Sequence, residues 1–202
     1  PYLARNGEKK ELVDTTIKDI QLGLVFFSLG ISTFAIIYAP WIQELLYHSR
    51  DAFVSDVIRF SLLVLPAYMV IHIYGSTLTA AGAIRTLIKV FGGAIIINII
   101  LNLVLIKEFG ALGSSLAALC SQYFSAAACY LLASRRFDLK VSMRSLFLYG
   151  AITFFLLLCF YLAQRAMINV WLILALAVSA MALLLFSQLS STRNYFIKSR
   201  HA

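Results

Sequence analysis

Long apolar runs separated by short polar connections set the pattern of this sequence. Two of these runs, residues 87–106 and 111–133, are joined only by the four residues KEFG at 107–110. At about 1.5 Å of rise per residue, 20 and 23 residues are each enough to cross the hydrocarbon core of a bilayer, which is roughly 30 Å thick. A connection this short holds no domain, so the pattern predicts two antiparallel helices that lie side by side as a membrane hairpin.

Two apolar runs precede the hairpin. The first spans residues 20–39 and is expected to end at Pro40, with a short surface helix predicted just before it at 8–19. The second spans residues 60–81 and contains Pro66. A proline inside a membrane helix is tolerated where neighbouring helices satisfy the backbone carbonyl that it frees, so we expect a kink there whose free carbonyl has a partner.

Two further apolar runs follow the hairpin, at 146–163 and 167–189, and both ends of the chain are polar. The sequence therefore predicts an all-α integral membrane protein with six transmembrane helices. Its predicted parts are a cytoplasmic segment at 1–19, a six-helix transmembrane region at 20–189 and a cytoplasmic tail at 190–202. Six spans leave no room for a globular domain.

The composition agrees with a membrane location for the whole chain. Hydrophobic residues make up 61% of it and charged residues only 13%, against about 25% charged in an average soluble domain. The first residue is proline and no secretory signal peptide is visible before the first run, so we expect the chain to be a fragment of a longer protein. Cys120, Cys129 and Cys159 all fall in apolar runs, where packing rather than a disulfide or a metal is expected.

Basic residues divide unevenly between the two sides of the predicted bundle. Thirteen of the 17 lysines and arginines fall on one side, in the two ends of the chain, around Arg85 and in the loop at 134–145. The other side holds Arg50, Arg59, Lys107 and Arg165. Because Lys and Arg in short loops are retained in the cytoplasm, both termini are predicted to be cytoplasmic and the turn at 107–110 to face outward.

The acidic residues argue against catalysis. All nine lie outside the six predicted membrane cores, and no pair has a spacing that suits acid–base chemistry or metal binding. We therefore expect no enzyme activity, no catalytic residue, no cofactor and no metal site. The net charge of +8 is assigned to contacts with anionic membrane lipid and not to nucleic acid, because no basic patch is interleaved with aromatic residues.

Three basic side chains in or beside the apolar runs are candidates for substrate binding. His72 is the one ionisable residue near the middle of a predicted span; it would either line a hydrated cavity or, more simply, form a neutral hydrogen bond with a neighbouring helix. Arg59 and Arg85 lie at the ends of predicted spans. Each would either extend to the membrane interface, the simpler interpretation, or point into an aqueous pathway as an anion ligand.

Small and polar residues inside the hairpin predict helix packing. Asn98 and Asn102 are four residues apart and hence on one helical face, where each is expected to form a hydrogen bond with the next helix. In the following run, small residues recur at intervals of three and four, which lets another backbone approach closely. They are Ser114, Ala118, Ser121, Ser125 and Ala128.

Several short motifs between residues 80 and 118 stand in the order found in a known family. They are Ala81-Gly82 and Arg85, then Asn98, then LNLVLI at 101–106, then FGALG at 109–113. In this order and spacing they resemble the C-terminal half of the polysaccharide-export flippases of the multidrug/oligosaccharidyl-lipid/polysaccharide exporter superfamily. Lys107-Glu108 departs from the pattern, since family members often have a proline there.

The resemblance implies that these six spans are helices nine to fourteen, the C-terminal part, of a two-lobe, fourteen-helix transporter. Such a protein would lie in the bacterial inner membrane and flip an undecaprenyl-diphosphate-linked oligosaccharide, such as an O-antigen unit, from the inner to the outer leaflet by alternating access. Its implied partners are membrane lipid, the lipid-linked oligosaccharide and the missing N-terminal lobe of the same chain.

Three alternatives stay open at this point. A lipid II flippase of the same superfamily fits as well. An ion-coupled drug exporter would share the architecture, but it is expected to carry an acid inside the membrane. A non-transporting membrane scaffold is the alternative from a different class of protein.

Overall fold

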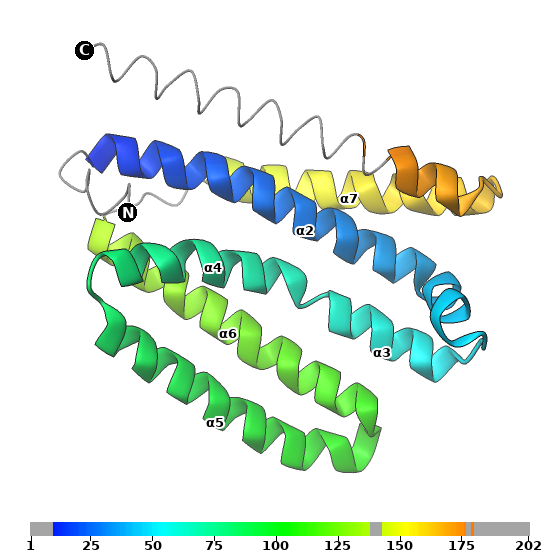
Figure 1. The fold of residues 1–202 in the computed structure, drawn as a ribbon, viewed down its shortest axis with the longest axis horizontal. Coiled ribbons are helices and arrows are strands. Elements are labelled where there is room, and N and C mark those ends of the chain that lie inside the picture. The colour runs from blue at the N-terminus through cyan, green and yellow to red at the C-terminus, as the bar shows by residue number, and fades with distance from the viewer. Residues whose placement is uncertain (1–9, 138–142, 177–178, 180–202) are drawn as a thin grey trace.

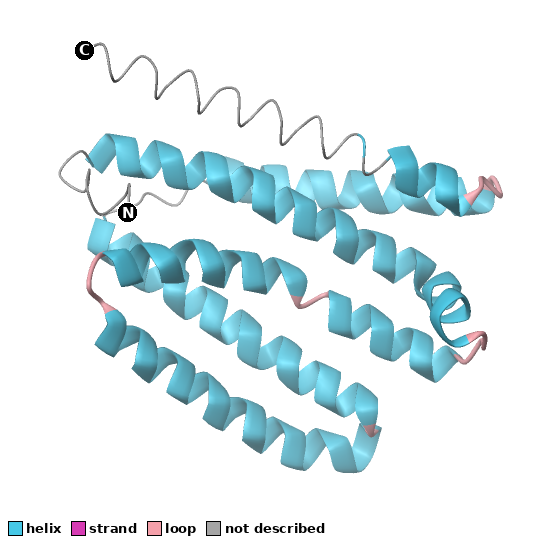
Figure 2. Ribbon diagram, viewed as in Figure 1, coloured by secondary structure: helices cyan, strands magenta, loops and turns pink. Residues whose placement is uncertain are grey.

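The computed structural model describes residues 10–137, 143–176 and 179 (Figure 1). Over these residues the chain is helical with short connections and contains no strand, so the predicted all-α class is confirmed (Figure 2). The helices are α2 (Lys10–Tyr47), α3 (Ala52–Leu62), α4 (Leu65–Ala80), α5 (Ile84–Phe109), α6 (Ala111–Phe137) and α7 (Met143–Arg165), with a short helical segment at 170–176. Most of the predicted sixth run at 167–189 and the predicted tail at 190–202 lie outside the described residues.

Four stretches of helix are long and apolar enough to cross a membrane. They are Gly23–Tyr47, Ala52–Ala80, Ile84–Phe109 and Ala111–Phe137, the second of which combines α3 and α4. α7 contains a shorter apolar stretch, Gly150–Arg165. Such helices are those of a membrane-embedded protein, while the number of six crossings stays a prediction.

The helices pack as a series of neighbours that run up and down the bundle (Figure 1). α5 packs on α6, α6 packs on α3 and α4, these two pack on α2, and α7 packs mainly on α2. α4 and α5, although consecutive in the chain, make only a small contact with each other. Each helix therefore has neighbours along part of its surface and leaves the rest exposed.

Two glycine turns mark the ends of the bundle. Gly82, with a φ of +74°, lies between α4 and α5, and Gly110, with a φ of +56°, lies between α5 and α6. Positive φ values are rare for residues with a Cβ, which explains glycine at both turns. We call the two ends the Gly82 end and the Gly110 end. The C-terminus of α6 lies at the Gly82 end, whereas the α2–α3 connection and the C-terminus of α7 lie at the Gly110 end (Figure 1).

Helix α2 is longer than predicted in both directions. Pro40 does not end it, because the helix continues through the proline to Tyr47. It also starts at Lys10, so residues 10–19 of the predicted surface helix belong to α2 instead, and residues 8 and 9 lie outside the described residues. A proline removes one backbone hydrogen bond from a helix, and the helix can continue where another donor replaces that bond.

The second span starts at Ala52 rather than near residue 60. Asp51 explains this start, because its side-chain Oδ1 accepts a hydrogen bond from the backbone N–H of Phe53 at 2.8 Å and so caps α3. The longer span includes Asp56. Glu44 and Glu108 likewise lie near the ends of the stretches Gly23–Tyr47 and Ile84–Phe109. The prediction that every acidic residue lies outside the spans is therefore wrong for these three residues.

Helices α5 and α6 form an antiparallel hairpin with Gly110 alone between them. Lys107, Glu108 and Phe109, predicted as part of the connection, continue α5 instead. One face of α6 packs here through small residues spaced four apart, all of them buried. They are Gly113, Ala117, Ser121, Ser125, Cys129 and Ala133. This face includes Ser121 and Ser125 of the predicted packing set. Ser114 is exposed and Ala118 is half-buried, so these two lie on a neighbouring face of α6. The predicted set mixed the two faces because it combined intervals of three and four residues.

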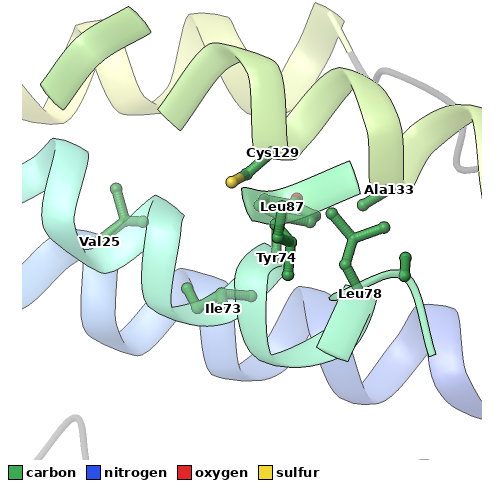
Figure 3. Close-up of a cluster of buried hydrophobic side chains, with 8 residues drawn as sticks. Val25, Ile73, Tyr74, Leu78, Leu87, Cys129 and Ala133 are labelled. Carbon is green, nitrogen blue, oxygen red and sulfur yellow. The ribbon is translucent and has the colours of Figure 1, made fainter. Parts of the chain in front are cut away.

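Two buried clusters hold the helices together. The larger joins α2, α4, α5 and α6, and Figure 3 shows its side chains converging between these helices. Its labelled members are Val25, Ile73, Tyr74, Leu78, Leu87, Cys129 and Ala133. The smaller joins α2 to α7 and to the segment at 170–176 through Tyr38, Phe160 and Ile173. Cys129 is fully buried in the larger cluster, as expected for a packed cysteine, whereas Cys120 and Cys159 are exposed and are not packed as predicted.

Candidate functional site

The outer surface of α5 is aliphatic. Ile95, Ile96, Ile99, Ile100, Leu103 and Val104 are each more than half exposed. No polar side chain interrupts this set, and a contiguous surface of this kind does not suit water. Its chemistry suits the hydrocarbon of a bilayer, so we take it as the lipid-facing side of the hairpin.

Helix α4 exposes a polar face instead. Its exposed residues are Tyr68, His72, Ser76, Thr79 and Ala80, of which only the last is apolar. The four polar residues follow one another at intervals of four, four and three, which places them on one face of the helix. We call them the α4 polar stripe. Because exposed polar side chains are costly against lipid, this face suits water, a polar ligand or another polar surface.

The sequence analysis singled out only His72 from the α4 polar stripe. Its imidazole is exposed, and no hydrogen bond joins it to a neighbouring helix among the described residues. Ser76 donates to the His72 backbone oxygen, and Thr79 donates to the Gly75 oxygen at 2.8 Å, so both hydroxyl oxygens keep acceptor capacity. Tyr68, Ser76 and Thr79 were missed, although polar residues at helical spacing within an apolar run were a signal for such a face.

Arg59 makes two contacts inside the protein. Its Nε donates to the backbone oxygen of Ile36 on α2 at 2.9 Å, and its Nη1 lies 2.5 Å from Oδ1 of Asp56. The carboxylate balances the charge of the guanidinium within the span. Arg59 thus joins α3 to α2, and neither of its predicted positions, at the membrane interface or in an aqueous pathway, is needed to explain it.

The break between α3 and α4 lies just before Pro66. Proline has no N–H, so the backbone oxygen of Leu62, four residues earlier, has no partner in its own helix. Ser32 on α2 donates to this oxygen at 2.8 Å, and Tyr123 on α6 donates to the next one, that of Leu63, at 3.1 Å. The expectation that neighbouring helices satisfy the carbonyl freed by Pro66 is therefore confirmed.

Arg85 belongs to a positively charged group at the Gly82 end. Arg85 and Lys89 are exposed and one turn apart on α5, while Arg135 and Arg136 are exposed at the C-terminus of α6. Arg136 donates to the Ala81 oxygen at 2.6 Å, which joins the C-terminus of α6 to the connection between α4 and α5. The four acidic residues whose side chains the structure describes all lie toward the Gly110 end. They are Glu44, Asp51, Asp56 and Glu108. Among the described side chains, positive charge therefore gathers at the Gly82 end, where it favours anions.

The two asparagines of the hairpin have different roles. Asn98 donates to the Oγ of Ser121 on α6 at 3.0 Å, which is an interhelical hydrogen bond. Asn102 donates to Asn98 of its own helix, to the backbone oxygen at 2.9 Å and to Oδ1 at 3.0 Å. Its own Oδ1 is buried and accepts no hydrogen bond from the described residues. The pair thus contributes one bond across the hairpin.

The described residues contain no group of His, Cys, Asp or Glu that could hold a metal ion. Comparison with known proteins found no matching family model, no matching curated protein and no matching solved structure. The chemistry of the exposed surfaces is therefore the main guide to function.

Proposed function

We propose that these helices belong to one lobe of a membrane transporter that flips an undecaprenyl-diphosphate-linked oligosaccharide from the inner to the outer leaflet for surface polysaccharide synthesis. The observation that carries this proposal is the α4 polar stripe, a polar face within the stretch Ala52–Ala80, which is long enough to span a membrane. A protein that only packs in lipid gains nothing from such a face, whereas a transporter needs polar walls around a hydrated path. The motif order between residues 80 and 118 supports the same class.

The proposal divides the substrate contacts between two places. The α4 polar stripe offers one aromatic ring, one imidazole and three hydroxyl groups, which suit the hydroxyl groups and apolar ring faces of sugars. Arg85, at the positive Gly82 end, suits a diphosphate at the membrane interface. We leave Arg59 out of the proposal, because its Nε and Nη1 already bind Ile36 and Asp56.

Replacing His72 tests whether the α4 polar stripe contacts the substrate. His72→Gln keeps a hydrogen-bonding side chain, so transport should be retained, whereas His72→Leu should lower transport about fivefold, the equivalent of one hydrogen bond worth about 1 kcal/mol. The measurement is transfer of labelled lipid-linked oligosaccharide across proteoliposomes that contain the full chain. Ile99→Leu on the lipid-facing side of α5 is the control and should change nothing. Equal transport by His72→Leu and the unchanged protein would count against contact between the α4 polar stripe and the substrate.

The same proteoliposomes separate this function from its rivals. Transport of lipid II in preference to the oligosaccharide lipid would assign the protein to lipid II flipping, and transport of neither would leave the ion-coupled exporter and the scaffold. An ion-coupled exporter needs a free acid in the membrane. Asp56 lies within the stretch Ala52–Ala80, but it is not free, because it forms an ion pair with Arg59.

The proposed orientation places both termini and the Gly82 end in the cytoplasm. A cysteine at Glu108, beside Gly110, should then react with an impermeant thiol reagent added outside intact cells, whereas a cysteine at Arg135 should react only after the cells are opened. Both positions are exposed, so access depends on the side of the membrane alone. The reverse labelling pattern would overturn the orientation.

A further inference from the structure

Each of the two prolines inside the membrane-spanning stretches frees one backbone carbonyl, and each freed carbonyl is taken by a side chain from the neighbouring stretch. Pro40 frees the oxygen of Ile36, four residues before it, and this is the oxygen that Arg59 binds at 2.9 Å. Pro66 frees the oxygen of Leu62, which Ser32 binds at 2.8 Å. The two contacts are reciprocal, because Arg59 reaches from the second stretch to the first and Ser32 reaches from the first to the second.

The chain between these two irregularities is tied together internally. Gln43 is completely buried, and its Oε1 accepts a hydrogen bond from Ser55 Oγ at 2.6 Å, which links the end of α2 to α3. Arg50 pairs with Glu44 at 2.6 Å, and this hydrogen bond raises the pKa of Arg50 above its usual range. Asp51 caps α3. Residues 41–62 thus form one compact helical hairpin at the Gly110 end (Figure 1), which we call the end hairpin.

We propose that the end hairpin is a hinged unit of the bundle. The hydrogen bonds from Arg59 to Ile36 and from Ser32 to Leu62, which we call the two latches, fix its angle relative to the rest of the bundle. In a continuous helix the backbone hydrogen bonds set the direction of the axis, but at Pro40 and before Pro66 one such bond is missing. At these two positions the direction of the helix axis depends on the side-chain donor that replaces the missing backbone hydrogen bond. Each latch is a single hydrogen bond between neighbouring helices, so it opens without breaking the helices themselves.

Two contacts with α6 mark the side on which the end hairpin rests. Ser61 Oγ, within the end hairpin, lies 3.0 Å from Ser115 Oγ, and Tyr123 donates to the oxygen of Leu63, the residue directly after the end hairpin, at 3.1 Å. With both latches closed, the end hairpin covers α6 next to the Gly110 turn. With the latches open, a rotation about the two proline positions moves it away from α6 and opens the Gly110 end. This inference concerns motion alone and does not depend on the substrate proposed above.

Proline replacement gives a direct test of the Arg59 latch. Spin labels at Leu46, in the end hairpin, and at Ile96, on α5, report their separation in the full chain through double electron–electron resonance; both positions are more than half exposed. Asp56→Asn removes the charge partner of Arg59 and should leave the distance distribution unchanged. Asp56→Asn with Arg59→Gln should at least double its width. Adding Pro40→Ala should restore the original width, because residue 40 then donates its own N–H to Ile36.

The Ser32 latch gives an independent second test. Ser32→Ala is a mild change and should also broaden the Leu46–Ile96 distribution, and adding Pro66→Ala should narrow it again by returning a donor to Leu62. A label pair at Ile96 and Leu131, within the α5–α6 hairpin, should stay narrow in every variant and so shows that the protein is folded. The proposal is overturned if neither latch variant broadens the distribution, or if the broadening persists when alanine replaces the matching proline.

Discussion

Gly113→Ala is expected to force the α5–α6 hairpin apart and to destabilise the bundle by about 3 kcal/mol, the upper part of the usual range for overpacking. A Cβ at residue 113 would lie 2.1 Å from the backbone oxygen of Leu105 and 2.4 Å from its carbonyl carbon. Because these are backbone atoms, no change of rotamer relieves the overlap, and the two helices have to separate. The small-residue face of α6 then loses its close contact with α5.

Gly92→Ala is the matched control for this substitution. Gly92 lies on α5 of the same hairpin, and a Cβ there would meet nothing within 4 Å. Alanine favours helix over glycine by up to about 1 kcal/mol, so this variant should be as stable as the unchanged protein or slightly more stable. Unfolding of the purified protein in detergent, induced by heat or by sodium dodecyl sulfate, measures both. A Gly113→Ala protein as stable as the control would contradict the close approach described here.

Tyr38→Ala is expected to release α7 from α2, at a cost of about 3 kcal/mol, as for other aromatic residues removed from a packed interior. Tyr38 is 3% exposed and stacks on Phe34 with ring centroids 4.7 Å apart, and its ring lies edge-on to Phe160 at 6.3 Å. Since α7 packs mainly against α2, it has little else to hold it among the described helices. The alanine leaves an empty volume in the centre of this contact.

The two tryptophans of the chain report on this contact directly. Trp41 and Trp171 lie edge to face in the same aromatic group, with centroids 5.3 Å apart. Their circular dichroism in the near ultraviolet should be lost in Tyr38→Ala. Tyr38→Phe removes only a hydroxyl whose hydrogen bond to the Phe160 oxygen is long, at 3.3 Å, so it should cost under about 1 kcal/mol and keep the signal. If Tyr38→Ala also keeps the signal, α7 is held by something other than this aromatic group.

The parts of the fold that depend on local pattern could be predicted from the sequence. Apolar runs of 20 residues or more predicted the helices around Gly110, and the partner of the carbonyl freed by Pro66 was expected from the chemistry of proline alone. The path of α2 through Pro40 could not be predicted, because it depends on Arg59, which is 23 residues away from Ile36 in the sequence. The sequence shows that a carbonyl is freed but not which side chain reaches it.

The candidate site was predicted only in part, for a similar reason. His72 was found because an ionisable residue inside an apolar run is rare. Serine and threonine are common in membrane helices, so the helical spacing of Ser76 and Thr79 with His72 was a weak signal until the buried face of α4 was known. The small residues of α6 show the same limit, since spacing alone did not decide between Ser114 and Gly113 as the start of the packed face.

The order in which the helices pack has a consequence for how the protein is made. Along the chain α6 follows α5, yet it packs between α5 and the α3–α4 pair, so it must enter the membrane between helices that have already been inserted. The contact between Tyr38 and Phe160 joins residues 122 positions apart and can form only after every other described helix except the segment at 170–176 has been synthesised. A nascent chain released up to residue 137 therefore still presents the Tyr38 face of α2 to its surroundings, and docking of α7 on that face is a late step of assembly.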